Sequence, residues 1–190
     1  CYGKRVDKVI TKKKKQEMLQ RFQDTYGIMK PALIYQSPFE LLVAVVLSAQ
    51  CTDERVNIVT AGLFPEYASP EKMLTLGIDG LEEKIKTCGL YHSKAKNLSA
   101  TCRILCEEYQ GEVPKTFDEL VKLPGVGRKT ANVLVSVLYD TPAIAVDTHV
   151  FRVANRMQLA VGTTPDSVEK GLQKAIPVEW WSRAHHWLIW

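Results

Sequence analysis

The chain has no apolar run close to the roughly 20 consecutive residues that a membrane-spanning helix needs. Its first five residues, Cys-Tyr-Gly-Lys-Arg, do not open a secretory signal. The five cysteines are odd in number and lack the short paired spacings of a disulfide scaffold, so free thiols in a reducing compartment are expected. These absences predict a soluble intracellular protein without a membrane partner.

A large excess of one charge is also missing. The 25 Lys and Arg residues against 21 Asp and Glu leave a net charge of +4, which alone does not indicate a nucleic-acid-binding protein. Lys12 to Lys15 form a run before an amphipathic stretch, and such a run can lie along a phosphate backbone. A solvated helix face is its more frequent meaning. Both interpretations stay open.

Strand-like alternation is absent, and the apolar residues recur with helical spacing along most of the chain. Pro, Gly and Ser or Asp residues punctuate this pattern. The pattern predicts helices at 39–49, 56–64, 70–76, 81–87, 93–109, 116–123 and 128–139. With 46% hydrophobic residues, 190 residues can bury a core as one unit or as two small lobes. The sequence therefore predicts an all-α protein with short connections.

Residues 123–132 read Leu-Pro-Gly-Val-Gly-Arg-Lys-Thr-Ala-Asn and join two helical patterns. This segment predicts a tight hairpin between helices, in which Gly125 and Gly127 supply φ angles and backbone clearance that other residues lack. Backbone amides that face outward at a helix start form a phosphate site. The hairpin is thus a candidate phosphate-binding element.

Lys129 follows the hairpin directly and is the chemically unusual residue of this segment. Apolar residues at 131, 134, 135 and 138 indicate a helix that begins near Gly127, with Lys129 in its first turn. The positive end of the helix dipole disfavours an ammonium group there, and partial burial would add to this, so the neutral, nucleophilic amine is favoured. A simpler alternative is that Lys129 reaches a phosphate beside Arg128.

Asp147 lies between the apolar stretch 143–146 and a second helical pattern at 150, 153, 154 and 157. This position predicts a helix N-cap, whose carboxylate accepts amide hydrogens from the following turn. A capping carboxylate is held rigidly, and one of its oxygens can still face a developing positive charge. Capping and catalysis are therefore compatible at Asp147.

Together the two segments resemble the helix-hairpin-helix and Gly/Pro-Asp signature of the endonuclease III family of DNA glycosylases. The resemblance extends through the Ser-Pro-Phe-Glu-Leu-Leu segment at 37–42 and the Leu-Ser-Ala-Gln-Cys-Thr-Asp segment at 47–53. It continues at 89–91, 93–95, 111–114 and 185–189, so that it spans roughly residues 38 to 190. A lone Gly-x-Gly hairpin is weak evidence, whereas these blocks in this order are highly specific.

The resemblance implies a two-lobed fold. Residues 31–141 would form a six-helix barrel that contains the hairpin, and residues 1–30 and 142–190 would form a second helical domain, with DNA and the lysine meeting between them. Pro142 is consistent with that boundary, because a proline there ends the preceding helix. The implied enzyme is a monomeric base excision repair glycosylase that removes oxidised pyrimidines from damaged double-stranded DNA and cleaves the strand by β-elimination.

The resemblance also assigns roles to single residues. Lys129 would attack the sugar and Asp147 would stabilise positive charge on it. Gln50 would fill the gap left by the extruded base and Leu90 would separate the opposite strand; without the resemblance they read as an exposed loop amide and a core leucine. The remaining DNA contacts would come from Leu123, Gly125, Val126, Gly127, Arg128 and His149, and a monovalent cation would bind the hairpin carbonyls.

Family members usually continue into a loop whose four cysteines bind a 4Fe-4S cluster. The cysteines here, at positions 1, 51, 88, 102 and 106, lack that spacing. Cys102 and Cys106 share an apolar helix face and are expected in the core, and the adjacent His185 and His186 are a poor zinc pair. The chain starts without Met and ends within an apolar run, so we expect the native protein to extend beyond Trp190 and to carry the cluster. The alternative is a lineage that lacks the cluster.

Three alternatives remain at this point. A mismatch or adenine glycosylase of the same fold would be monofunctional, but such relatives generally lack lysine at the position of Lys129. A non-catalytic helix-hairpin-helix module would need neither Lys129 nor Asp147. The chain could also be an inactive fragment that has lost DNA affinity with the missing loop.

Overall fold

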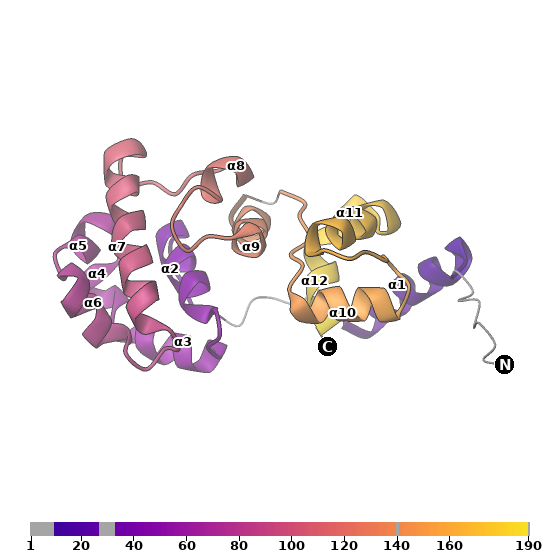
Figure 1. Cartoon of the computed structure of the whole chain (residues 1–190), viewed down its shortest axis with the longest axis horizontal. Coiled ribbons are helices and arrows are strands. Elements are labelled where there is room, and N and C mark those ends of the chain that lie inside the picture. The colour runs from indigo at the N-terminus through magenta and orange to yellow at the C-terminus, as the bar shows by residue number, and fades with distance from the viewer. Residues whose placement is uncertain (1–9, 27–32, 140, 190) are drawn as a thin grey trace. The chain divides into compact units, whose positions relative to one another are not determined.

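The structure is a computed structural model that describes residues 10–26, 33–139 and 141–189 (Figure 1). The chain divides into two compact units, one formed by Cys1–Lys30 with Pro142–Trp190 and the other by Pro31–Thr141. Every regular element in the described ranges is helical, which confirms the all-α prediction. Among these helices none has the length and apolar character to cross a membrane. The described residues do not include Cys1, Trp190 or the side chains of His185 and His186. The sequence-based expectations for these four residues therefore lie outside the structure.

The unit of residues 31–141 is built around one buried helix. Its elements are α2 (Pro38–Ser48), α3 (Asp53–Ala61), α4 (Phe64–Tyr67), α5 (Pro70–Leu74), α6 (Gly77–Ile85), α7 (Tyr91–Glu108), α8 (Phe117–Leu120) and α9 (Arg128–Tyr139). Residues 39–47 of α2 are all buried, and α2 packs against α3, α7 and α9. The long helix α7 packs in turn against α5 and α6. The hairpin before α9 is therefore attached to the core of this unit.

Side-chain caps fix where these helices begin. The Ser37 hydroxyl accepts a hydrogen bond from the Glu40 amide at 3.1 Å, and Pro38 occupies the first helical position, where a missing N–H is harmless. The Thr52 hydroxyl accepts from the Arg55 amide, so α3 begins at Asp53 and not at the predicted residue 56. The predicted helix at 81–87 likewise begins earlier, at Gly77. The short helix α4 was missed, because four residues are too few to show a period.

The second unit contains α1 (Lys12–Tyr26), α10 (Thr148–Arg156), α11 (Pro165–Ala175), the 3-10 turn η1 (Val178–Trp180) and α12 (Trp181–Ile189). Its core joins residues from both ends of the sequence. Leu19 of α1 and Trp187 of α12 are each 1% exposed. The Trp187 ring stacks on Phe22 at 6.3 Å and meets the edge of Trp180 at 5.7 Å. Helix α10, which follows Asp147, packs against α11 and α12.

Candidate active site

The hairpin between α8 and α9 is a closed turn anchored in the core. The Val126 amide donates to the Leu123 carbonyl at 3.0 Å, and both side chains are buried. The Thr101 hydroxyl of α7 donates to the Pro124 carbonyl at 2.9 Å. Because the turn is bonded to itself and to α7, its backbone is held in one conformation. Such preorganisation suits a turn that receives a phosphate.

The two glycines of the hairpin have different reasons to be glycine. Gly125 has a φ of +80°, and a Cβ on it would lie 3.0 Å from Cβ of Asn97, so both conformation and space require glycine there. Gly127 lacks a left-handed φ, and a Cβ on it would meet nothing within 4 Å. The prediction that Gly127 supplies a special φ is therefore wrong. What it supplies is open space in front of the backbone.

Lys129 and Arg128 lie in the first turn of α9, as the periodicity predicts, and both side chains are exposed. The partial burial of Lys129 that the sequence left open is therefore not found. The Arg128 guanidinium lies over the Phe117 ring, 5.0 Å from its centroid, which is a cation–π contact with α8. The hairpin thus presents two cations beside the first-turn amides of a helix, which have no partners within that helix.

Asp147 is the N-cap of α10, as predicted. Its backbone is extended, with φ −94° and ψ −177°, and its Oδ1 accepts a hydrogen bond from the Val150 amide at 2.8 Å. The side chain is half-buried, and the preceding residues Ile144 and Val146 are buried in the core of this unit. His149 lies in the first turn of the same helix and is also half-buried. The Asp147 carboxylate is therefore fixed in direction.

The structure brings Gln50 and Leu90 to neighbouring loops. A Cβ on Gly89 would lie only 2.9 Å from the Gln50 carbonyl oxygen, so the two backbones touch. Gln50 and Leu90 have φ values of +53° and +59°, a left-handed conformation that a non-glycine residue adopts at an energetic cost of order 1–3 kcal/mol. Leu90 is 57% exposed, so its interpretation as a core leucine is wrong. Two exposed residues with strained backbones, on loops that touch, indicate a functional surface.

Lys94 is a residue whose burial was not predicted from the sequence. It is 4% exposed, and its Nζ donates to the Leu47 carbonyl near the C-terminus of α2 at 2.8 Å. Burial lowers the pKa of Lys94 below its ordinary value. A cation at the end of α2 complements the helix dipole and supports the loop that carries Gln50. The signal in the sequence is the position of Lys94, four and eight residues before Leu98 and Cys102 and therefore on the same face of α7.

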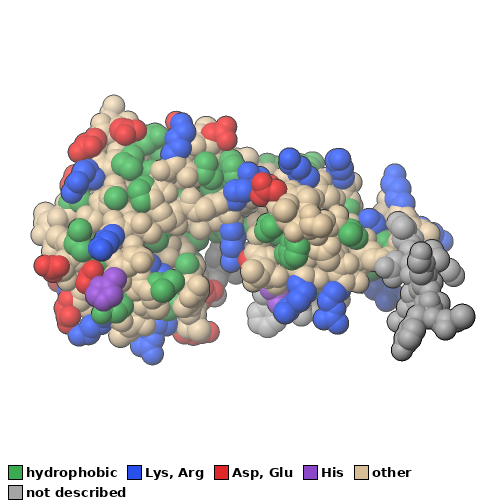
Figure 2. All heavy atoms as spheres, viewed as in Figure 1, with side chains coloured by type: hydrophobic (Ala, Val, Ile, Leu, Met, Phe, Trp, Pro, Cys, Tyr) green, Lys and Arg blue, Asp and Glu red, His purple; other side chains and the backbone are tan. Residues whose placement is uncertain are grey.

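The small net charge conceals an asymmetry between the two units. The unit of residues 1–30 and 142–190 has 14 Lys and Arg against 7 Asp and Glu, a net charge of +7. The unit of residues 31–141 has 11 against 14, a net charge of −3. Acidic side chains are correspondingly sparse over α10 and α11 on the face shown in Figure 2. The unit that carries Asp147 is therefore the one suited to a phosphate backbone.

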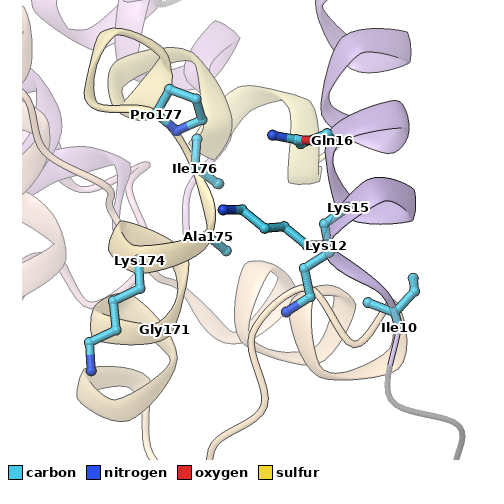
Figure 3. A pocket seen from close by; sticks show the side chains of 9 residues that line it. All are labelled: Ile10, Lys12, Lys15, Gln16, Gly171, Lys174, Ala175, Ile176 and Pro177. Atoms are coloured by element: carbon cyan, nitrogen blue, oxygen red, sulfur yellow. The ribbon is translucent and has the colours of Figure 1, made fainter.

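The lysine run at the start of α1 is partly structural. Lys12, Lys13 and Lys14 are exposed, whereas the half-buried Lys15 donates from Nζ to the Leu159 carbonyl at 2.9 Å. Lys12 and Lys15 of α1 and Lys174 of α11 line a pocket of about 580 Å³ (Figure 3). The run thus contributes both a packing contact and part of the positive charge of this unit.

No metal site is evident in the described part of the chain. Within it, no three His, Cys, Asp or Glu side chains are placed to hold an ion together, and Cys51, Cys88, Cys102 and Cys106 are free thiols. The residues described here do not fit a 4Fe-4S cluster, which needs four ligands. No chemical step is therefore assigned to one.

Residues 43–178 match the family described as HhH-GPD superfamily base excision DNA repair protein. The chain is 57% identical over 160 residues to endonuclease III of Rickettsia conorii, covering 84% of this chain and 76% of that protein. It is 50% identical over 180 residues to endonuclease III of Escherichia coli K12, covering 95% of this chain and 85% of that protein.

Solved structures agree with this similarity. A trapped endonuclease III–DNA covalent intermediate superposes with a TM-score of 0.90 at 48% identity, over 95% of this chain and 85% of that chain. A thermostable thymine-DNA glycosylase superposes with a TM-score of 0.79 at 22% identity, over 93% of this chain and 84% of that chain, which shows a shared fold.

Proposed function

Since the chain belongs to the endonuclease III family of base excision repair DNA glycosylases and AP lyases, we propose that Lys129 is its nucleophile and oxidised pyrimidines in double-stranded DNA its substrates. The observation that carries the proposal is the position of Lys129, exposed in the first turn of a helix directly after a hairpin that is anchored to α7. The similarity to an endonuclease III trapped covalently on DNA supports a covalent step. Borohydride trapping tests it, as described in the Discussion.

Extrusion of the damaged nucleotide comes first, because the glycosidic carbon is inaccessible inside the base stack. We assign the stabilisation of the opened duplex to Gln50 and Leu90. Gln50 has amide donors and an acceptor for an orphaned base, and Leu90 has an exposed apolar side chain that can wedge between bases. Their loops touch, so both can enter the same stretch of duplex.

The neutral Lys129 amine then attacks C1′ of the extruded nucleotide. The N–C1′ bond forms, the glycosidic bond breaks and the base leaves with a proton. Ring opening gives an imine between Nζ and C1′, which makes the C2′ proton acidic. Loss of that proton and breakage of the C3′–O bond cleave the strand 3′ to the lesion. Hydrolysis of the imine then restores Lys129. One amine therefore serves both the glycosylase and the lyase reaction.

Asp147 provides the negative charge that this sequence of steps requires. Positive charge develops on the sugar as the base departs, and a fixed carboxylate lowers the energy of that state without reorganising. The Val150 amide holds the carboxylate in place. The same group can accept a proton from the attacking amine. We propose these two roles for Asp147, in addition to its capping of α10.

We propose that the hairpin of residues 123–127 binds a backbone phosphate next to the reacting sugar, with Arg128 and His149 as further DNA contacts. A monovalent cation on its carbonyls stays a prediction.

We also propose that the enzyme acts as a monomer inside the cell, where its DNA substrate is. Light scattering at working concentration would measure the monomer mass. Endonuclease III proteins bind a 4Fe-4S cluster, and the described residues include no group of three or more His, Cys, Asp or Glu side chains that could hold a metal ion.

The two hairpin glycines offer a matched pair of variants. Gly127→Ala is expected to leave the melting temperature unchanged, because its Cβ meets nothing in the protein, and to weaken DNA binding at least tenfold by blocking the phosphate. Gly125→Ala is expected to destabilise the protein by about 1–2 kcal/mol, because it forces alanine into a left-handed conformation beside Asn97. Thermal unfolding and equilibrium binding to abasic-site duplexes measure both effects. Normal DNA binding by Gly127→Ala would contradict the proposed phosphate site at the hairpin.

Gln50→Ala and Leu90→Ala test the extrusion step. Each is expected to slow removal of a damaged base by roughly 10- to 100-fold, since unstacking costs a few kcal/mol. Strand cleavage at a preformed abasic site is expected to change much less, because an abasic nucleotide has no base to unstack. Single-turnover rates on the two substrates give the comparison. Equal losses on both substrates would contradict the assignment.

A further inference from the structure

The loops that carry Gln50 and Leu90 also carry two thiols in contact. Cys51 follows Gln50, and Cys88 lies two residues before Leu90. The two thiols are hydrogen-bonded to each other. Both are free cysteines in the structure. The catalytic steps described above use neither thiol.

The surroundings of the two thiols favour a cross-link. A Cβ on Gly89 would lie 2.9 Å from the Gln50 carbonyl oxygen, so the backbones that flank the two cysteines already touch. A disulfide needs such proximity and side chains that point toward each other. The hydrogen bond between the Cys51 and Cys88 thiols places the two side chains next to each other. The fold thus requires little backbone movement to join them.

Exposure and charge give the two thiols different roles. Cys51 is half-exposed, whereas Cys88 is 1% exposed. Burial raises the pKa of Cys88 to about 11, and the positive charges of Lys94 and Arg55 act in the opposite direction. Cys51 is therefore the thiol that a dissolved oxidant reaches, because oxidation of a thiol depends on access to it. Cys88 is placed to react second.

We propose that Cys51 and Cys88 form an oxidation site at which a hydroperoxide converts the two thiols into a disulfide between these loops. The Cys51 sulfur attacks the peroxide, so that an S–O bond forms, the O–O bond breaks and water leaves. The Cys88 sulfur then attacks the sulfur of the Cys51 sulfenic acid, so that the S–S bond forms and the S–O bond breaks. The departing hydroxyl takes the Cys88 proton and leaves as a second water. Two thiols lose two electrons in total, and hydrogen peroxide is reduced to two molecules of water.

The disulfide would restrain the two strained residues on either side of it. Gln50 and Leu90 must enter the duplex together during base extrusion, a consequence that rests on the proposed function. A bond between the adjacent residues fixes the spacing of the two loops. Base removal is therefore expected to fall in the oxidised protein, whereas cleavage at a preformed abasic site is retained.

Peptide mapping tests the bond independently of catalysis. Trypsin cuts after Arg55 and Lys86, so Cys51 and Cys88 fall on separate peptides that only a disulfide joins. The purified protein is treated with hydrogen peroxide, alkylated, digested without reductant and examined by mass spectrometry. We expect the joined peptide pair, lighter than the sum of the two by two hydrogens, and its disappearance after treatment with a thiol reductant.

Cys102 and Cys106 provide an internal comparison. They lie one turn apart in α7, burial raises the pKa of Cys102 to about 12, and Cys106 is hydrogen-bonded to the Glu71 carboxylate. Trypsin also separates this pair, by cutting after Arg103. We expect it to remain reduced under the peroxide dose that joins Cys51 to Cys88. A Cys51 oxidised only to sulfinic acid, or alkylated thiols at both Cys51 and Cys88, would overturn the proposal.

A matched variant tests the consequence for activity. Cys88→Ala keeps Cys51 but cannot form the disulfide. Oxidation at other residues is the same in this variant as in the wild type, so a difference between them reports on the disulfide. We expect peroxide to remove most base excision by the wild type, reversibly with reductant, and to leave the variant unaffected. If the joined peptides form but peroxide changes base excision equally in the wild type and in Cys88→Ala, the disulfide is confirmed. The proposed role of the two loops in base extrusion is then contradicted. Loss of borohydride trapping in untreated protein would instead contradict the proposed nucleophile.

Discussion

Lys129→Gln is expected to abolish the covalent protein–DNA species that borohydride traps on abasic-site DNA. Glutamine is one atom shorter than lysine and keeps most of its helix propensity, but it has no nucleophilic amine. Removal of an enzyme's nucleophile lowers turnover by up to about 10⁶-fold, and we expect a loss of at least roughly 10³-fold here. Denaturing gel electrophoresis after reduction measures the cross-link directly.

The structure predicts that this variant folds and binds DNA. Lys129 is exposed in the first turn of α9, where the helix dipole disfavours a cation, so its removal leaves the melting temperature unchanged or slightly higher. Lys122→Gln is the matched control, because Lys122 is an exposed lysine on the other side of the hairpin that has no assigned role. A cross-link of normal yield in Lys129→Gln would move the nucleophile to another residue.

Asp147→Asn is expected to lower single-turnover base excision by roughly 10²- to 10³-fold, equivalent to about 2.7–4 kcal/mol of lost transition-state stabilisation. Asparagine caps a helix about as well as aspartate, so the free energy of unfolding should change by less than about 0.5 kcal/mol. Catalysis needs the negative charge of Asp147, and capping needs only an oxygen acceptor. The variant therefore separates the two roles.

Two further variants complete this test. Asp147→Ala removes both the charge and the cap, so it should add about 1 kcal/mol of destabilisation to the same loss of activity. Thr164 caps α11 in the same unit through the Ser167 amide. Thr164→Ala should lower the melting temperature without affecting turnover of the folded protein. Normal turnover in Asp147→Asn would leave Asp147 with a structural role alone.

Prediction from the sequence was most successful where the determining interactions are local. The start of α9 near Gly127 and the cap at Asp147 were both predicted, because caps and apolar periods depend on residues three or four positions apart. Errors arose at α3, whose cap at Thr52 precedes the apolar pattern, and at α4, which is shorter than the window in which a period is visible.

Glycine shows where local information ends. The sequence identified both hairpin glycines but attributed the same conformational need to each. Only the packed structure separates Gly125, which faces Asn97 of α7 with a φ of +80°, from Gly127, which faces open space. Asn97 is distant in the sequence, so no local pattern contains this contact.

By itself the sequence determined that the chain is helical, that a cation follows a glycine-containing hairpin and that a carboxylate caps the helix after it. Each of these features is set by hydrogen bonds and apolar spacing within about one helical turn. Tertiary structure alone decided that Gln50 approaches Gly89, that Cys51 contacts Cys88 and that Lys94 is buried against Leu47. These contacts join segments about 40 residues apart and exist only because α2, α6 and α7 pack into one core, where non-local burial outweighs local preference.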